Sequence, residues 1–363
     1  MAVSVTGASG SSAHGGALTI TGSGFGTKST AAPIIWDNCD HTVDDTSQIT
    51  AAGWTGAWPS AGTQAYRGQY RTAPYRTGMN APHSRVGKYF AGAHGDNAGG
   101  DQGYNVMLWK NRTLGTFPNY TYACWYQRSD DAWVFGLNDA DDNYKCYAYG
   151  DGTSPYDANY FYTEYNPRPT STSSSVGWKL SAGMGLDPAD FWGTGGLNPH
   201  AGTWSKVEHF FTISNVANGG RLIIKENNVT YYDQTMRGDN VAGTGRNDGI
   251  GGFSRNSGNG NNYRYFADIY LDYSLQHVML GNASTLAACT VLEVCPPTAW
   301  SDTSVTVTVN RGALADSGSI YAYVYDAAGT ANSTGYDVSG ADGGGGGASP
   351  THRIVMGARA RWV

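Results

Sequence analysis

Closely spaced turn residues divide this chain into segments that are too short for long helices. Glycine fills 51 of the 363 positions, and Asn, Asp and Pro recur between the apolar stretches. Glycine adopts positive φ angles and proline cannot continue a helix, so both residues mark tight turns. Aromatic residues, which favour strands, make up 13% of the chain. The sequence therefore predicts an all-β fold with no helix of three turns.

Apolar and polar residues alternate along the central part of the chain. Because successive side chains of a strand point to opposite faces, this period of two predicts strands with one buried face. We predict strands at residues 120–127, 132–137, 144–149, 160–165, 204–213, 220–225 and 263–273.

A glycine-rich motif near the start gives a first family resemblance. Residues 19–26 read Thr-Ile-Thr-Gly-Ser-Gly-Phe-Gly, which resembles the second strand of IPT/TIG domains, a group of immunoglobulin-like folds. The pattern stops after Pro33, while residues 278–282, 300–309 and 319–329 look like the remaining strands. We therefore predict one discontinuous immunoglobulin-like β-sandwich formed by residues 1–35 and 277–340, with 36–276 inserted at a loop. Two separate incomplete domains are the alternative.

The inserted segment carries a second resemblance. Its segments 203–213, 220–228 and 266–272 are similar to concanavalin A-like jelly-roll sandwiches, among them glycan-binding laminin-G modules and polysaccharide lyases. The resemblance implies a jelly roll with a concave, sugar-binding sheet. The lyase motifs are not matched: Leu275-Gln-His-Val278 lacks the spacer of a Gln-x-His strand.

Period two assigns faces to the predicted strands. On 204–213, Val207, His209 and Phe211 face the core, which makes His209 a core histidine. On 266–273, Ala267 and Ile269 face the core. The opposite faces carry aromatic rings beside charged groups, as a sugar surface requires. The predicted carbohydrate-binding residues are Tyr122, Tyr126, Arg128, Lys206, Glu208, Asp268 and Tyr270. A well-packed, tyrosine-rich sheet without a ligand is the alternative.

Acidic and cysteine residues suggest two further features. Asp139, Asp141 and Asp142 offer hard oxygen ligands for calcium, the one cofactor considered, although a solvated turn explains them as well. Spacing allows disulfides between Cys289 and Cys295 and between Cys124 and Cys146; small buried thiols are the alternative.

The C-terminal segment, residues 341–363, combines a glycine hinge with a basic end. Five glycines at 343–347 form a flexible joint. Beyond it, Arg359, Arg361 and Trp362 are residue types that anchor interfaces. The segment is either a disordered tail or an assembly tail that docks on a neighbouring subunit.

Charge and hydropathy exclude several classes of partner. The net charge is −6 with scattered basic residues, so we expect no nucleic acid as partner. We also expect no membrane span and no signal peptide, because the needed apolar runs are missing. Similar arrangements occur in bacteriophage virion proteins. We therefore expect a non-enzymatic, homo-oligomeric structural protein of a virion surface or the extracellular space that binds a polysaccharide or cell-surface glycan.

Two other functions compete with this expectation. The first is a lyase or depolymerase that acts on an anionic glycan, with Tyr126 or Tyr270 transferring the proton and Arg128 or Lys206 neutralising a uronate. The second is a pure scaffold without a ligand.

Overall fold

Antiparallel strands make up most of the protein in the computed structural model. It describes residues 2–41, 47–58, 68–74, 79–94, 106–129, 144–150, 160–167, 176–182, 190–192, 203–238, 245–252 and 262–341. Helical structure in these ranges is limited to α1 (Ser47–Ala51) and a 3₁₀ turn (Leu286–Ala288). The all-β prediction is confirmed.

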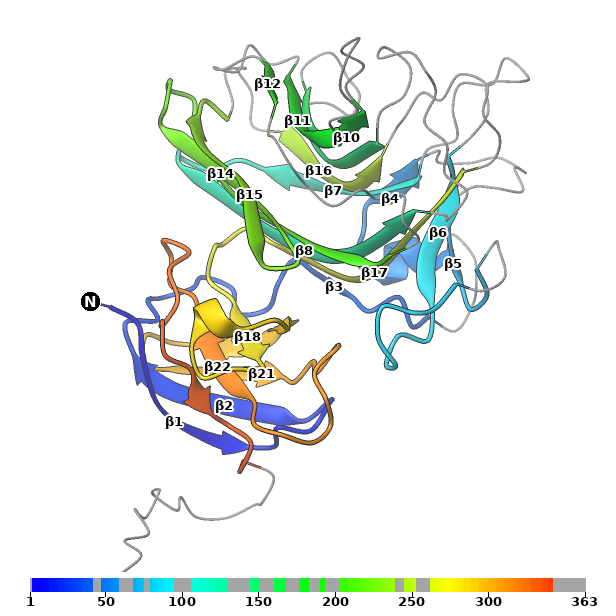
Figure 1. Cartoon of the computed structure of the whole chain (residues 1–363). Helices are drawn as coiled ribbons and strands as arrows, with labels where there is room; N and C mark the ends of the chain where they lie inside the picture. The colour runs from blue at the N-terminus through cyan, green and yellow to red at the C-terminus, as the bar shows by residue number, and fades with distance from the viewer. Residues whose placement is uncertain are drawn as a thin grey trace, which may run out of the picture.

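Strands from the first and last parts of the described chain form one small β-sandwich (Figure 1). Its first sheet has the order β1-β2-β21-β20, and its second sheet has the order β19-β18-β22-β23. The bounds are β1 Ser4–Gly10, β2 Ala17–Ser23, β18 Val278–Gly281, β19 Leu292–Cys295, β20 Pro297–Trp300, β21 Ser304–Thr308, β22 Tyr321–Val324 and β23 Tyr336–Asp337. We call this unit the small sandwich.

Alternation explains how the small sandwich forms. On β2, Leu18 and Ile20 are fully buried between the two sheets, and Val305 of β21 joins them in the same core. The intervening Thr19 faces away from this core, where its hydroxyl hydrogen-bonds that of Thr306 at 2.9 Å. Residues far apart in the sequence thus share one sheet and one core.

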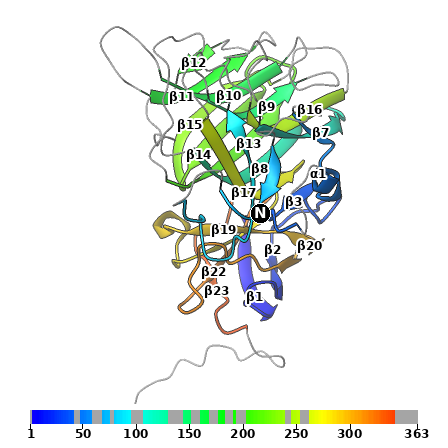
Figure 2. The same ribbon diagram turned by 90° about the vertical axis from the view of Figure 1, so that its right-hand side faces the viewer.

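The residues between these strands form a large sandwich of two curved sheets (Figures 1 and 2). One sheet has the order β12-β11-β10-β9-β16-β7-β4, and the other has the order β15-β14-β13-β8-β17-β6-β5, with β3 also paired to β17. The bounds are β3 Ile35–Asp37, β4 Gly56–Trp58, β5 Gln69–Arg71, β6 Tyr89–His94, β7 Val106–Thr113, β8 Asn119–Ser129, β9 Tyr144–Gly150, β10 Tyr160–Pro167, β11 Val176–Ala182, β12 Asp190–Trp192, β13 Ser205–Ile213, β14 Gly220–Glu226, β15 Val229–Met236, β16 Gly245–Gly252 and β17 Asn262–Asp272.

Six of the seven strands predicted in this region coincide with β8, β9, β10, β13, β14 and β17. The seventh, residues 132–137, lies outside the described residues. A bulge between Ala267 and Tyr270 breaks the period of two on β17, and Asp268 at the bulge has a φ of 47°. Ala267 pairs with Tyr126 and shares its outward face, so the prediction that Ala267 faces the core is wrong.

The cysteines do not form the predicted disulfides. Cys39, Cys124, Cys289 and Cys295 are all buried free thiols. Cys124 is free, while the side chain of its predicted partner Cys146 lies outside what the structure describes, and Cys289 is not bridged to Cys295. Burial raises the pKa of Cys295 to about 12, as it does for a thiol removed from water. These four residues act as small buried side chains.

The second sheet of the small sandwich packs against the β8–β13–β17 sheet of the large one (Figure 1). Aromatic side chains fill this contact, including Tyr122, Phe210 and Tyr270 from the large sandwich and Tyr323 and Tyr325 from the small one. We call this contact the junction. It positions every group of the candidate site described below.

Candidate functional site

The two faces of β13 separate the core of the large sandwich from the junction. Val207, His209 and Phe211 are fully buried on the inner side, as period two predicts. The ring of His209 lies between Trp125 and Tyr147, with centroids 5.0 and 5.1 Å away. Desolvation lowers the pKa of His209 to about 3, which identifies a neutral core histidine.

The outer faces of β8, β13 and β17 carry the predicted sugar-binding residues, and the small sandwich covers Tyr122 and Tyr270 among them. Tyr122 and Tyr270 are 0% exposed, and Glu208 is 2% exposed. Tyr122 donates a hydrogen bond to Glu208 Oε1 at 2.9 Å. Tyr270 donates to Asp272 Oδ2 at 3.0 Å, and Lys28 approaches the same oxygen at 2.6 Å. The expected open concave face is therefore corrected to a buried contact between two sandwiches.

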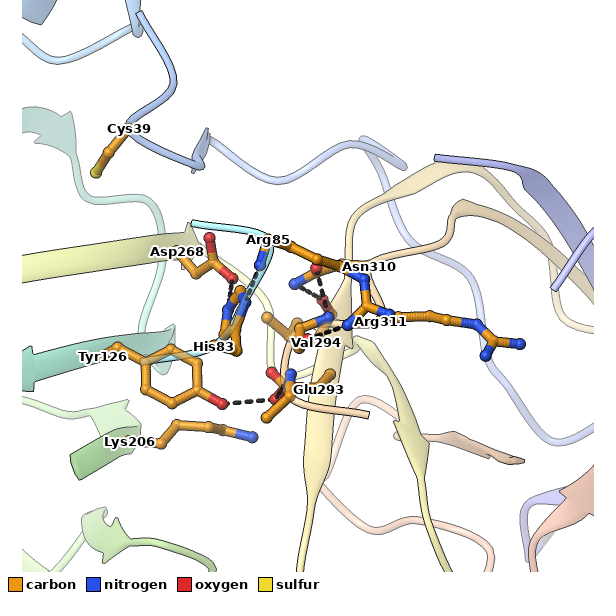
Figure 3. Close-up of polar contacts among 12 residues, drawn as sticks. Cys39, His83, Arg85, Tyr126, Lys206, Asp268, Glu293, Val294, Asn310 and Arg311 are labelled. Carbon is orange, nitrogen blue, oxygen red and sulfur yellow. Dashed lines mark hydrogen bonds and ion pairs between the residues drawn. The ribbon is translucent and has the colours of Figure 1, made fainter. Parts of the chain in front are cut away.

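Tyr126 and Lys206 reach across the junction into the small sandwich (Figure 3). Tyr126 donates to Glu293 Oε1 at 2.5 Å, and Lys206 Nζ donates to the carbonyl oxygen of Leu292. The same Glu293 oxygen accepts the Ala313 N–H at 2.8 Å. Gly312 permits this approach, because a Cβ there would lie 2.3 Å from the Glu293 carboxyl carbon. These side chains fasten the two sandwiches together.

The remaining two predicted residues lie beside this group. Asp268 accepts a hydrogen bond from His83 Nε2 at 2.9 Å, and the His83 ring stands edge-on to Tyr126 with centroids 5.4 Å apart (Figure 3). Arg128, 6% exposed, lies opposite Tyr265 of β17. The structure thus brings Tyr126, Lys206 and Asp268 to one end of the junction.

Burial also changes the acidity of the two tyrosines that the lyase alternative uses. Desolvation, reinforced by Glu293, raises the pKa of Tyr126 well above its usual value. Desolvation, reinforced by Asp272, does the same for Tyr270. Both phenols remain protonated at neutral pH, and both already donate to a carboxylate.

A cavity of about 590 Å³ opens between the two sandwiches and adjoins the Tyr126 and Lys206 group, because Leu292, whose carbonyl oxygen accepts from Lys206, also lines it. This size lies within the ~300–1,000 Å³ that is typical of small-molecule sites. The large sandwich contributes Glu208, Lys225 and Asn228, and the small sandwich contributes Tyr325. The remaining described residues around it are Thr285, Leu286, Ala287, Cys289, Leu292, Gly329, Thr330, Ala331, Ser333 and Thr334.

Both polar and apolar residues line this cavity. The carboxylate of Glu208 is held by Tyr122, and the amide of Asn228 donates to the carbonyl oxygen of Thr290 at 3.3 Å. Tyr325 is 3% exposed, and its ring stacks on His277 at a centroid distance of 4.0 Å. Such a wall can accept and donate hydrogen bonds while covering an apolar ligand face.

Of the seven predicted residues, Glu208 is the one found among the described cavity-lining residues. Sequence reasoning missed Lys225, Asn228 and Tyr325. One signal was present for Lys225, because predicted strands 204–213 and 220–225 are consecutive and, as a hairpin, would pair. Their register places Glu208 opposite Lys225. Tyr325 comes from the small sandwich, so no pattern within the inserted segment could reveal it.

Several predicted residues lie outside the described ranges, namely Asp139, Asp141, Asp142, Arg359, Arg361 and Trp362. In the part of the chain that is described, no three His, Cys, Asp or Glu side chains gather as metal ligands. No described helix is long and apolar enough to cross a membrane.

No protein-family model matches the chain, and no curated protein does either. One similar solved structure is an alginate lyase in complex with an alginate trisaccharide, with a TM-score of 0.43, 14% identity and coverage of 67% of this chain and 99% of that one. Another is the binding domain of botulinum neurotoxin serotype D/C, with a TM-score of 0.35, 12% identity and coverage of 67% and 49%. A third is domain 4 of an extracellular arabinanase from Geobacillus stearothermophilus in complex with arabinotriose, with a TM-score of 0.33, 11% identity and coverage of 66% and 93%.

Proposed function

We propose that this chain is a carbohydrate-binding β-sandwich protein whose ligand occupies the cavity between the two sandwiches. The observation that carries the proposal is the composition of the cavity wall. The carboxylate of Glu208 and the hydroxyls of Thr285 and Thr334 lie around the same space as the apolar side chains of Leu286 and Leu292.

Carbohydrates require such a mixed wall. A sugar ring has apolar C–H faces and a rim of hydroxyls, each of which must exchange its hydrogen bonds with water for bonds with protein. Glu208 supplies acceptors, the threonine hydroxyls supply both donors and acceptors, and Leu286 and Leu292 shield the ring. The two sandwiches together would enclose the ligand more fully than one open sheet.

Cavity filling tests this proposal. We expect wild-type protein to bind at least one member of a panel of neutral and acidic oligosaccharides in calorimetric titrations. Ala331→Trp should abolish that binding, because Ala331 lines the cavity. Ala299→Trp is the matched control, since Ala299 is exposed on β20 of the same sandwich.

Two outcomes would contradict the proposal: no oligosaccharide binds, or Ala331→Trp binds as tightly as wild type. Reducing and unsaturated ends are followed in the same samples, because their release would favour the depolymerase alternative.

The wider role that we propose is a structural one on a virion or extracellular surface. It is supported by the IPT/TIG-like pattern at residues 19–26. Antibodies against the purified chain should label intact particles or cells of its source; labelling that requires lysis would contradict this location. Homo-oligomer formation is part of the same proposal and is measured by light scattering.

A further inference from the structure

Lys225 brings a positive charge to the cavity wall. It lies on β14, opposite Glu208 of β13, and its Nζ is 4.8 Å from the ring centroid of Phe210. In the described part of the chain, the side-chain amine of Lys225 has no hydrogen-bond or ion-pair partner. A half-buried ammonium on a cavity wall is stabilised by a face-on aromatic ring, but a full counter-charge stabilises it more.

The neighbouring carboxylate already has its own partners. Glu208 accepts the Tyr122 hydroxyl at 2.9 Å. Lys206 lies beside it, and although burial opposes the charged amine, Cys124, Glu208 and Glu293 outweigh that effect and raise the pKa of Lys206. Lys206 therefore stays charged and balances the buried carboxylates, which leaves Lys225 as the positive group available at the wall.

We infer that the cavity takes an acidic carbohydrate and that Lys225 binds its carboxylate. This inference rests on the proposed function and specifies the ligand class. The hydroxyl rim of the sugar would meet Glu208 and Thr334 while its acidic group meets the ammonium. A charge-assisted bond of this kind is short and directional, so it also orients the sugar in the cavity.

Paired ligands separate charge recognition from sugar recognition. We would titrate di- and trisaccharides of galacturonate, glucuronate and mannuronate, each beside its methyl ester, which keeps the sugar and removes the charge. We expect at least one acid to bind roughly ten- to a hundredfold more tightly than its ester. Affinity for that acid should fall as salt concentration rises, because added ions screen the pair.

Variants then assign the effect to one side chain. Lys225→Met should reduce binding of the acid to the level of its ester, and Lys225→Arg should retain most of the preference. Lys110→Met is the matched control, because it removes the same charge from β7 in the other sheet. Equal binding of acid and ester, or a preference that survives in Lys225→Met, would overturn the inference while the proposed function stands. Failure of every sugar to bind would overturn both.

Discussion

At the scale of single residues, the junction depends on carboxylates that burial makes costly to ionise. Asp272 is 4% exposed, and desolvation raises its pKa to about 6 although Lys28 and Tyr270 favour the charged form. Burial also raises the pKa of Glu293. Between about pH 4 and pH 6 the folded chain keeps a proton on Asp272 that the unfolded chain has released. The contribution of Asp272 to the free energy of unfolding therefore falls as pH rises through this window.

This effect can be isolated with one substitution. We expect Asp272 to lower the free energy of unfolding by about 2 kcal/mol between pH 4 and pH 7, and Asp272→Asn to remove that part of the slope. Urea unfolding at a series of pH values measures it. Asp233→Asn removes an exposed carboxylate on β15 and should keep the wild-type slope. An unaltered slope in Asp272→Asn would show that another group is responsible.

At the scale of elements, the bulge in β17 sets which side chains reach the junction. Asp268 adopts a φ of 47° there, in the left-handed region that costs most residues about 1–2 kcal/mol. Its carboxylate accepts the His83 hydrogen bond at 2.9 Å. Asp268 thus affects the stability of the bulge in two ways: its backbone conformation is costly, and its side-chain hydrogen bond is stabilising.

Three substitutions at Asp268 should differ in their free energies of unfolding in a defined order. Asp268→Asn tolerates the left-handed region and keeps an acceptor for His83, so we expect it to be the most stable of the three. Asp268→Gly loses the acceptor but fits the backbone, and Asp268→Ala loses both. We expect Asp268→Ala to unfold about 1 kcal/mol more easily than Asp268→Gly in urea titrations. Equal stability of these two would mean that the backbone conformation carries no cost.

Period two could be predicted on β13 because the strand pairs with β8 over nine residues without a register shift, so its side chains keep to their two faces. The same rule failed at Ala267, since an extra residue in one strand changes no hydrophobic pattern that a single sequence displays. It also assigned Tyr122 and Glu208 correctly to the outer face, while leaving open what covers that face. An alternating pattern indicates which face of a strand is buried. The residues that cover the outer face here come from distant strands such as β19 and β22, which the local pattern does not identify.

At the scale of the whole molecule, the junction couples the two sandwiches. Phe210 and Tyr325 meet across it with ring centroids 6.1 Å apart, and the polar contacts of Tyr126 and Lys206 lie in the same interface. Removing the small sandwich from this contact would expose aromatic side chains and would take from the Lys206 amine its partners in the small sandwich. Separate unfolding of the two units is therefore unfavourable.

Hydrogen exchange tests this coupling. We expect amides of β18 and β22 to open with nearly the same free energy as those of β8 and β17. Phe210→Ala should lower that free energy by about 3–5 kcal/mol. The loss of protection from exchange should be largest for amides of the small sandwich. Val216→Ala, at a residue that is 57% exposed, is the control and should change little. Early exchange of β18 and β22 in wild type would indicate two independent units.

The pairing of β2 with β21 has a consequence for synthesis of the chain. Thr19 and Thr306 are 287 positions apart, yet they lie side by side in one sheet. As the polypeptide leaves the ribosome, almost all of the described sequence must be synthesised after β2 before its partner β21 emerges. The large sandwich can form during that interval, whereas the small sandwich forms last, against a large sandwich that is already folded. Cotranslational folding thus begins in the middle of this chain and ends by joining its two flanks.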